Sequence, residues 1–244
     1  MFRTLLFNPL YNILIVIVNL IPGGDIGLAI IILTILIKLL ILPVYTSSIR
    51  TQVRMKEIEP KLKEIKQKYE KDLPEQSRRT MELYKENKIN PFSSFLVLFI
   101  QLPIILALFW VFRDSLVVHP DIIYSFITAP ENINSQFLGL VDISASQNII
   151  LAVLTGLTQF LQVQLTTPKQ PKITTKEKAP SLGNDFARSM DIQIRYVMPL
   201  IIIFIAWQLP AAISLYWITS NLFHLLFGLK IKKEQKNTPA LKQA

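Results

Sequence analysis

The chain has 244 residues, 51% of them hydrophobic, and a formal net charge of +9 at pH 7. Its mean hydropathy of +0.39 is too high for an ordinary soluble domain, and the apolar residues fall in long blocks, which indicates a membrane protein. It has no cysteine, which excludes disulfides, thiolate catalysis and cysteine-ligated metals.

The first apolar block, residues 1–21, carries three asparagines. Asn8, Asn12 and Asn19 are spaced by 4 and 7 residues, so they share one face of a helix. This pattern favours an amphipathic helix lying in the membrane interface over residues 1–25. A true span and a signal peptide are the alternatives. The signal peptide is disfavoured because Arg3 is the only residue of a positive n-region and no small-residue cleavage site follows the block.

The remaining apolar blocks predict five transmembrane helices, because a bilayer core of roughly 30 Å needs about 20 helical residues. The blocks cover residues 26–49, 91–112, 148–165 and 196–229. The last would form a single helix about 51 Å long, which exceeds the core thickness. Pro210 disfavours helical geometry at Leu209, so we expect two helices with a turn at 209–211.

The charges between these blocks predict the orientation of the chain. Lys and Arg outnumber Asp and Glu by 12 to 8 in residues 50–88, by 6 to 3 in 166–195 and by 5 to 1 in 230–244. In residues 113–147 the balance reverses, to 1 against 4. Because basic loops stay cytoplasmic, we expect 113–147 to be an external loop and 166–195 to be a cytoplasmic loop. The N-terminus would then lie outside and the basic tail 230–244 in the cytoplasm.

Residues 50–90 predict a cytoplasmic helical hairpin. Apolar residues recur at spacings of 3, 4, 3 and 4 along its first helix, which is the pattern of an a/d seam. Pro60 should kink or restart this helix, and Asp72-Leu73-Pro74 should end it before a second helix to Glu86. A merely solvated surface is the alternative to a docking arm. The candidate docking residues are Met55, Ile58, Leu62, Ile65, Tyr69, Met81 and Tyr84.

The usual catalytic motifs are missing from the chain. Its two histidines are His119 and His224, and it has no HExxH, P-loop or GxSxG sequence. We therefore expect no enzymatic activity, no cofactor and no metal. The apolar cores of the predicted spans also contain no Asp or Glu, and proton-coupled transporters normally need intramembrane carboxylates.

Uncharged polar residues form stripes within the spans, together with one lysine. Lys38 lies in "LAIIILTILIKLLILPV", where a central lysine costs roughly 2.5–3.5 kcal/mol. Snorkelling of Lys38 and interhelical hydrogen bonding of the other residues are the alternatives to a hydrated cavity. The alignment of the stripes favours the cavity. The stripe residues are Thr34, Gln101, Thr155, Gln159, Gln162, Ser214, Trp217, Asn221 and His224.

Several stretches, in this order, resemble one family over about residues 7–233. They are "LFNPLYNIL", "LTILIKLLILPV", "MKEIEPKLKEIKQKY", "MELYKENKINP", "IQLPIILALFWVF", "MPLIIIF" and "LPAAISLYWITSNLF". The chain resembles YidC-type membrane protein insertases of the YidC/Oxa/Alb family, in a short form without the large external domain. The resemblance implies an all-α membrane protein with five transmembrane helices around a hydrophilic groove that opens to the cytoplasm and sideways to lipid.

The resemblance also implies a function and partners. The family inserts and helps to fold nascent membrane proteins in the bacterial plasma membrane without nucleotide hydrolysis. The implied partners are nascent membrane proteins, the ribosome and anionic lipids, with a Sec translocon and the signal recognition particle receptor as further candidates, and no DNA. Lys38 matches a groove position that is most often arginine, so the charge is kept but the bidentate fork is lost. Gln162, Tyr216 and Trp217 match positions that line the groove or touch the substrate.

The basic tail is a candidate contact surface, and two other protein classes are alternatives to an insertase. Lys230, Lys232 and Lys233 are placed to contact ribosomal RNA or anionic headgroups, although the tail could equally serve only to set orientation. A small channel or solute transporter is the alternative function, and the tight turn at 209–211 argues against it. A structural scaffold or assembly chaperone would bind nascent helices without moving a tail across the membrane.

Overall fold

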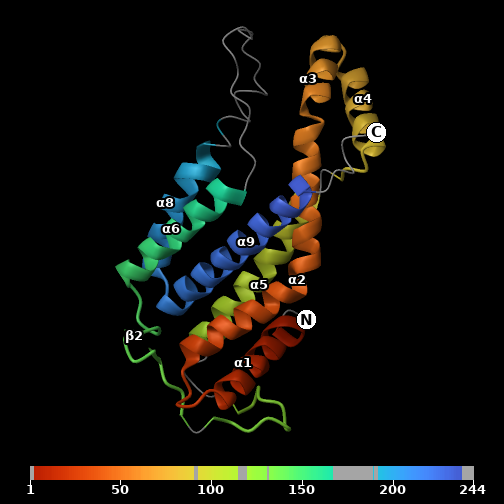
Figure 1. Ribbon diagram of the computed structural model, residues 1–244. Coiled ribbons are helices and arrows are strands. Elements are labelled where there is room, and N and C mark those ends of the chain that lie inside the picture. The colour runs from red at the N-terminus through yellow and green to blue at the C-terminus, as the bar shows by residue number, and fades with distance from the viewer. Residues whose placement is uncertain are drawn as a thin grey trace. The chain divides into compact units, whose positions relative to one another are not determined.

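The computed structural model describes residues 3–90, 93–114, 120–130, 132–166, 189 and 192–237. Two compact units make up the chain, Met1–Leu40 with Leu102–Phe227 and Ile41–Gln101 with Gly228–Ala244. The elements in order are η1 (Arg3–Phe7), α1 (Asn8–Leu20), α2 (Ile26–Glu57), α3 (Glu59–Lys68), α4 (Leu73–Glu86), α5 (Ser93–Asp114), β1 (Gln136–Phe137), β2 (Val141–Asp142), α6 (Ile149–Thr166), η2 (Gln193–Val197), α8 (Met198–Gln208) and α9 (Ala211–Asn237) (Figure 1).

The helices confirm the all-α membrane class. In the described part of the chain, four helices are long and apolar enough to cross a membrane, namely Arg3–Leu20, Ile26–Glu57, Ile149–Thr166 and Ala211–Glu234. Two shorter apolar helices cover Phe99–Phe112 and Gln193–Gln208. The break predicted at 209–211 is confirmed, because α8 ends at Gln208, Leu209 is extended and α9 begins at Ala211. The number of helices that span the membrane stays a prediction.

In the first unit, α6 and α8 pack closely side by side (Figure 1). A Cβ atom added at Gly156 would lie 2.2 Å from Cγ1 of Ile203 and 3.0 Å from the carbonyl oxygen of Pro199. One turn further along α6, the Phe160 ring lies against Tyr196, with centroids 6.1 Å apart. Small residues allow such close approach between membrane helices, which associate mainly through van der Waals packing.

The segment 132–147 ties the ends of several helices of the first unit together. Asp25 caps α2, because its Oδ1 accepts hydrogen bonds from the backbone N–H groups of Gly27 and Leu28 at 2.8 and 3.1 Å. Its Oδ2 accepts from the N–H of Leu138 at 2.8 Å. At the turn between α8 and α9, the N–H of Ala212 donates to the carbonyl oxygen of Ile143 at 2.9 Å. These bonds satisfy backbone groups that no regular element would pair.

The asparagine face of α1 contacts protein and is not the polar surface that the sequence suggested. Asn12, 1% exposed, donates through Nδ2 to the carbonyl oxygen of Ile122 at 2.9 Å and accepts from the N–H of Tyr124 at 2.8 Å. Asn19 Nδ2 donates to the carbonyl oxygen of Thr128 at 2.7 Å. Two of the three asparagines therefore bind the backbone of residues 122–128, although Asn19 stays exposed. The interfacial position of α1 stays a prediction.

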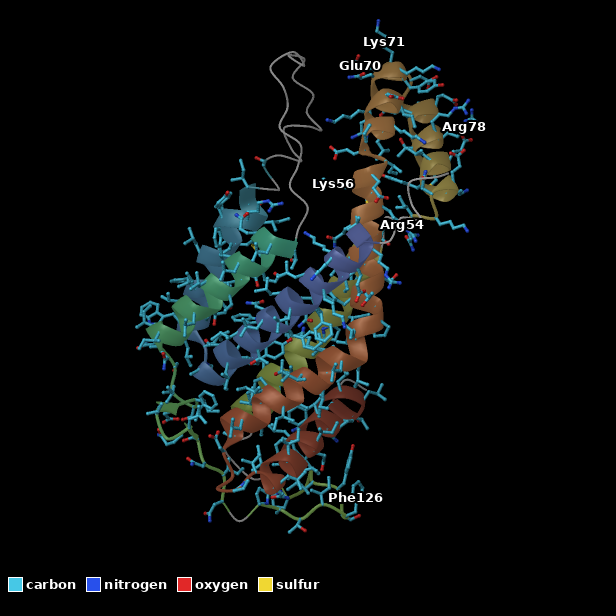
Figure 2. The ribbon with its side chains drawn as sticks, viewed as in Figure 1. Arg54, Lys56, Glu70, Lys71, Arg78 and Phe126 are labelled. Atoms are coloured by element: carbon cyan, nitrogen blue, oxygen red, sulfur yellow. The ribbon has the colours of Figure 1, made fainter. Side chains whose placement is uncertain are left out.

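In the second unit, α3 and α4 form the predicted hairpin, with Glu70 and Lys71 at its turn (Figure 2). The restart at Pro60 is confirmed, since α2 ends at Glu57 and Pro60 lies in the first turn of α3. Asp72 caps α4 by accepting a hydrogen bond from the N–H of Glu75 at 3.1 Å. Proline disrupts a helix interior but is tolerated in a first turn, which explains why the chain restarts there.

Candidate functional site

Lys38 is buried within the first unit. Only 3% of its surface is exposed, and Thr34, one turn earlier on α2, is fully buried. The Lys38 ammonium lies 5.8 Å from the centroid of the Tyr216 ring, within the range of a cation–π contact. Snorkelling would carry the ammonium to an exposed end of the helix, whereas here protein covers the side chain. The structure therefore disfavours the snorkelling alternative.

The described surroundings of the lysine come from α9, against which α5 packs. Tyr216 on α9 is 1% exposed, and its ring lies 6.3 Å from that of Phe112 on α5. His224, two turns further along α9, is close enough to Lys38 to interact electrostatically. A positive charge in such weakly polar surroundings attracts an anion more strongly than the same charge in water. The Lys38 ammonium can therefore attract a negatively charged group electrostatically.

The polar stripes of α6 and α9 meet each other. Thr155, fully buried, donates through Oγ1 to the carbonyl oxygen of Leu151 at 2.8 Å and approaches that of Ser214 at 3.4 Å. Asn221 Nδ2 donates to Oγ1 of Thr158 at 3.2 Å and approaches the carbonyl oxygen of Thr155 at 3.4 Å. For Thr155 and Asn221, both buried, the structure shows the interhelical alternative. Ser214 is also buried, but it contributes only its carbonyl oxygen, and its Oγ has no hydrogen-bond partner. The three residues do not line an open surface in this conformation.

The other predicted groove residues are half-buried. In the first unit these are Gln159, Gln162, Trp217 and His224, and Gln162 Nε2 donates to Oγ1 of Thr166 at 2.9 Å. Gln101, also half-buried, belongs to the second unit. Groove lining stays a prediction for these residues.

Three predicted regions lie partly outside the described residues. These are the external loop, which contains His119, the loop 166–195 and the end of the tail. The described part of the tail continues α9 to Asn237, with Lys230 and Lys233 exposed and Lys232 half-buried. The role of these lysines in ribosome or lipid contact stays a prediction.

Arg195 is a buried charge that the sequence reasoning counted only as a loop residue. It is 3% exposed, and its Nη1 lies 3.5 Å from Oε1 of Gln164 on α6. The available signal was its position directly before the apolar block that begins at 196, on a helix that starts earlier than the block itself. Side-chain burial at a helix end depends on tertiary packing, which hydrophobic periodicity does not report.

The seam of the hairpin faces its own interior, which corrects the predicted docking surface. Ile58, Leu83 and Ile89 are about 5–6% exposed and form a small core. The partly buried residues packed against this core are Met55, Leu62, Ile65 and Tyr84. Ile58 is therefore closed to a partner, and only the uncovered parts of the partly buried side chains are accessible. Of the predicted docking residues, Met81 is 45% exposed and Tyr69 is half-buried, and docking through the exposed surface of the hairpin stays a prediction.

The outer surface of α4 carries a cluster of ion pairs. Arg78 and Arg79 both contact Glu75 and Glu82, at nitrogen–oxygen distances of 2.7–3.2 Å. The hydrogen bond from Arg78, with a further one from Arg79, lowers the pKa of Glu75 to about 2. Glu75 therefore stays ionised at physiological pH. Exposed pairs of this kind contribute little to stability individually, so we interpret the cluster as a property of the hairpin surface.

Replacing Leu83 with alanine is expected to loosen the hairpin. Truncation of a fully buried leucine costs about 2–5 kcal/mol, and this small core has few other residues to compensate. Limited proteolysis of the full-length protein should show faster cleavage within residues 60–88. Met81→Ala on the same helix is the matched control and should leave the rate nearly unchanged. Equal cleavage rates in the two variants would contradict the assignment of Leu83 to the core.

Metal binding finds no support among the described residues, where no group of three His, Asp or Glu side chains could hold an ion. The features that the structure does show at this site are one enclosed positive charge and the polar contacts of α6 and α9.

Comparisons with known proteins identify the family. The family model for the 60Kd inner membrane protein matches residues 17–238. The membrane protein insertase YidC of Clostridium tetani (strain Massachusetts / E88) is 34% identical over 224 residues, which cover 91% of this chain and 89% of that protein. Its counterpart in Fusobacterium nucleatum is 32% identical over 211 residues, which cover 86% and 88%.

A solved structure supports the same fold. A crystal structure of an active YidC insertase with its first transmembrane domain resolved matches with a TM-score of 0.57 at 24% sequence identity. The match covers 93% of this chain but 46% of the solved one, so this chain spans less than half the length of that protein. Together with the order of the sequence motifs, these matches show that the chain belongs to the 60Kd inner membrane protein family, the YidC/Oxa/Alb family.

Proposed function

We propose that this chain is a membrane protein insertase, which inserts nascent membrane proteins into the bacterial plasma membrane and helps them to fold. The observation that carries the proposal is the enclosed Lys38 beside the polar contacts of α6 and α9, in a chain of this family. The two relatives named as insertases are matched over nearly 90% of their length, which supports the same activity here.

The proposed mechanism begins with the positive charge. An acidic residue in the leading tail of a substrate is attracted to the Lys38 ammonium, which lowers the barrier to moving that tail through an apolar layer. Because Lys38 is 3% exposed, the substrate must first displace part of its cover, and the Tyr216 ring is one part of that cover. Lysine supplies a point charge and not a bidentate fork, so the attraction does not require fixed geometry.

The second step of the mechanism is release of the apolar segment into lipid. The hydrogen bonds between α6 and α9 are 3.2–3.4 Å long, at or beyond the upper limit for N–H···O bonds and, for the Thr155 hydroxyl, beyond that for O–H···O bonds, so they are weak and easily exchanged. The segment would leave along these two helices, driven by about 25 cal/mol for each Å² of apolar surface removed from water. No nucleotide is needed in this scheme. The N-terminus is placed outside and the basic tail in the cytoplasm, where ribosomes and anionic headgroups are available partners.

A protease-protection assay tests the proposed function. The purified full chain is reconstituted into vesicles, and a single-span substrate with an acidic N-terminal tail is synthesised in their presence. An insertase should protect the tail from added protease, whereas vesicles without the protein should not. Binding of the substrate without protection of its tail would indicate a scaffold or assembly chaperone. Sustained ion flux in the absence of substrate would indicate a channel.

A further inference from the structure

The outer face of η1 and α1 is largely apolar. Leu5 in η1 and Ile13, Val16 and Leu20 in α1 recur at helical spacing and are 70%, 43%, 38% and 76% exposed. The opposite face, which includes Tyr11 and other fully buried residues, packs into the first unit. Asn12 and Asn19 bind the backbone of residues 122–128, so the surface that α1 leaves uncovered is mainly hydrocarbon, apart from the exposed Asn19.

The segment 120–130, which lies against α1, exposes aromatic side chains beside this face. Phe126 is 82% exposed, and its ring lies 5.6 Å from that of Tyr124, which is 36% exposed (Figure 2). An open hollow of about 510 Å³ lies where this segment meets α1, and its lining includes Val16, Leu20 and Phe126. The segment is held in place, because Asn12 and Asn19 bind its backbone at both ends.

The surface formed by residues 4–24 and 122–130 carries no charge, and the exposed charges Arg3 and Asp121 flank it. No ionisable acid or base occurs between residues 4 and 24 or between residues 122 and 130 except the phenol groups of its tyrosines. A protein partner recognised through charge is therefore not indicated. The helix α2 follows α1 after five intervening residues, is apolar enough to cross a membrane and also exposes apolar side chains, at Ile32, Leu36 and Leu40. Because an uncharged apolar surface in a membrane protein suits contact with lipid, we infer lipid as the occupant.

We propose that residues 122–130 form an aromatic membrane anchor. Phe126 and Tyr124, together with the outer face of α1, enter the boundary between headgroups and acyl chains on the side of the bilayer where this segment lies. Aromatic side chains favour this boundary. Backbone groups of residues 122–128 would be costly to remove from water, and their hydrogen bonds to the asparagine side chains reduce that cost when the segment enters the boundary. The anchor depends on membrane residence alone and not on the proposed insertase activity.

The absence of native cysteine allows a direct test. Phe126→Cys in the full chain is labelled with a nitroxide in phosphatidylcholine–phosphatidylglycerol vesicles, and its collisions with oxygen and with a water-soluble nickel complex are compared. Lys71→Cys, at the exposed turn of the hairpin, is the aqueous control. The ratio of oxygen collisions to nickel collisions should be higher for the label at 126 than for the label at 71. The label at 71 should show the ratio of a side chain in water.

Two outcomes would overturn the proposal. Nickel accessibility at 126 equal to that at 71 would place the loop in water. A label at 126 that neither reagent reaches would indicate a protein contact, such as a second copy of the chain. Asn19→Ala combined with Phe126→Cys tests the hold of α1 on the loop, since Asn19 is exposed and its loss should not unfold the protein. The label should then become more mobile and lose part of its oxygen preference, and unchanged spectra would contradict this part of the proposal.

Discussion

Lys38→Met is expected to lower the insertion rate of single-span substrates with acidic N-terminal tails about tenfold. A hydrogen bond to a charged group contributes about 1.5–3 kcal/mol, and 1.4 kcal/mol corresponds to a factor of ten. Methionine has nearly the length and shape of the lysine stem, so the buried position stays filled. Lys38→Arg should keep most of the rate, because it keeps the charge, and Lys38→Glu should lower the rate further. Protease protection in reconstituted vesicles measures all four proteins.

Stability provides the control for this prediction. Lys38 is 3% exposed, and enclosing a charge is costly, so the methionine variant should unfold at the same temperature as the wild type or at a higher one. A lower insertion rate in a protein of equal or greater stability would then report the charge and not the fold. The wild type and Lys38→Met should insert substrates with uncharged tails at similar rates. If the variant inserts acidic tails at the wild-type rate, the attraction by Lys38 is not part of the mechanism.

Gly156→Ala is expected to destabilise the packing of α6 against α8. In an isolated helix this change would be favourable by about 0.5–1 kcal/mol, because glycine has the larger conformational entropy to lose. Here the new Cβ would lie 2.2 Å from Cγ1 of Ile203, and a β-branched side chain has little freedom to move away. Overpacking of this kind costs about 1–3 kcal/mol, so the net effect should be a loss of stability. Thermal unfolding in detergent measures it.

Leu157→Val is the matched control for Gly156→Ala. Leu157 is the next residue of α6 and is 49% exposed, so this change alters helix preference without crowding α8. The unfolding temperature of Leu157→Val should stay close to that of the wild type. The unfolding temperature of Gly156→Val should be lower than that of Gly156→Ala. A wild-type or higher unfolding temperature for Gly156→Ala would show that α8 can move aside at little cost.

Features set by local chemistry were predictable from the sequence. Pro210 and Pro60 restrict the backbone of their own neighbourhood, and both breaks lie where the sequence put them. The seam spacing likewise predicted the face on which the first hairpin helix would pack. The spacing does not distinguish a seam that packs against the second helix of the hairpin from one that packs against a partner protein, because both arrangements bury the same residues.

Features that depend on distant parts of the chain were not predictable in this way. A stripe of Thr, Ser and Asn is compatible with water or with a neighbouring helix, and in α6 and α9 the buried members contact each other. The burial of Lys38 depends on Tyr216, which lies 178 residues later. Periodicity identifies which residues share a face, but it carries no information on what that face meets.

The side chain of Asn12 makes the same hydrogen bonds as one residue of a parallel β-strand. Its Nδ2 donates to the carbonyl oxygen of Ile122, and its Oδ1 accepts from the N–H of Tyr124. In a parallel pair of strands, a backbone N–H and C=O bond in this way to the two residues on either side of the opposite residue. A primary amide carries the same donor and acceptor as a peptide group, whereas aspartate lacks the donor and leucine lacks both. The residue at position 12 is therefore dictated by the main chain of a segment that lies 110 residues later.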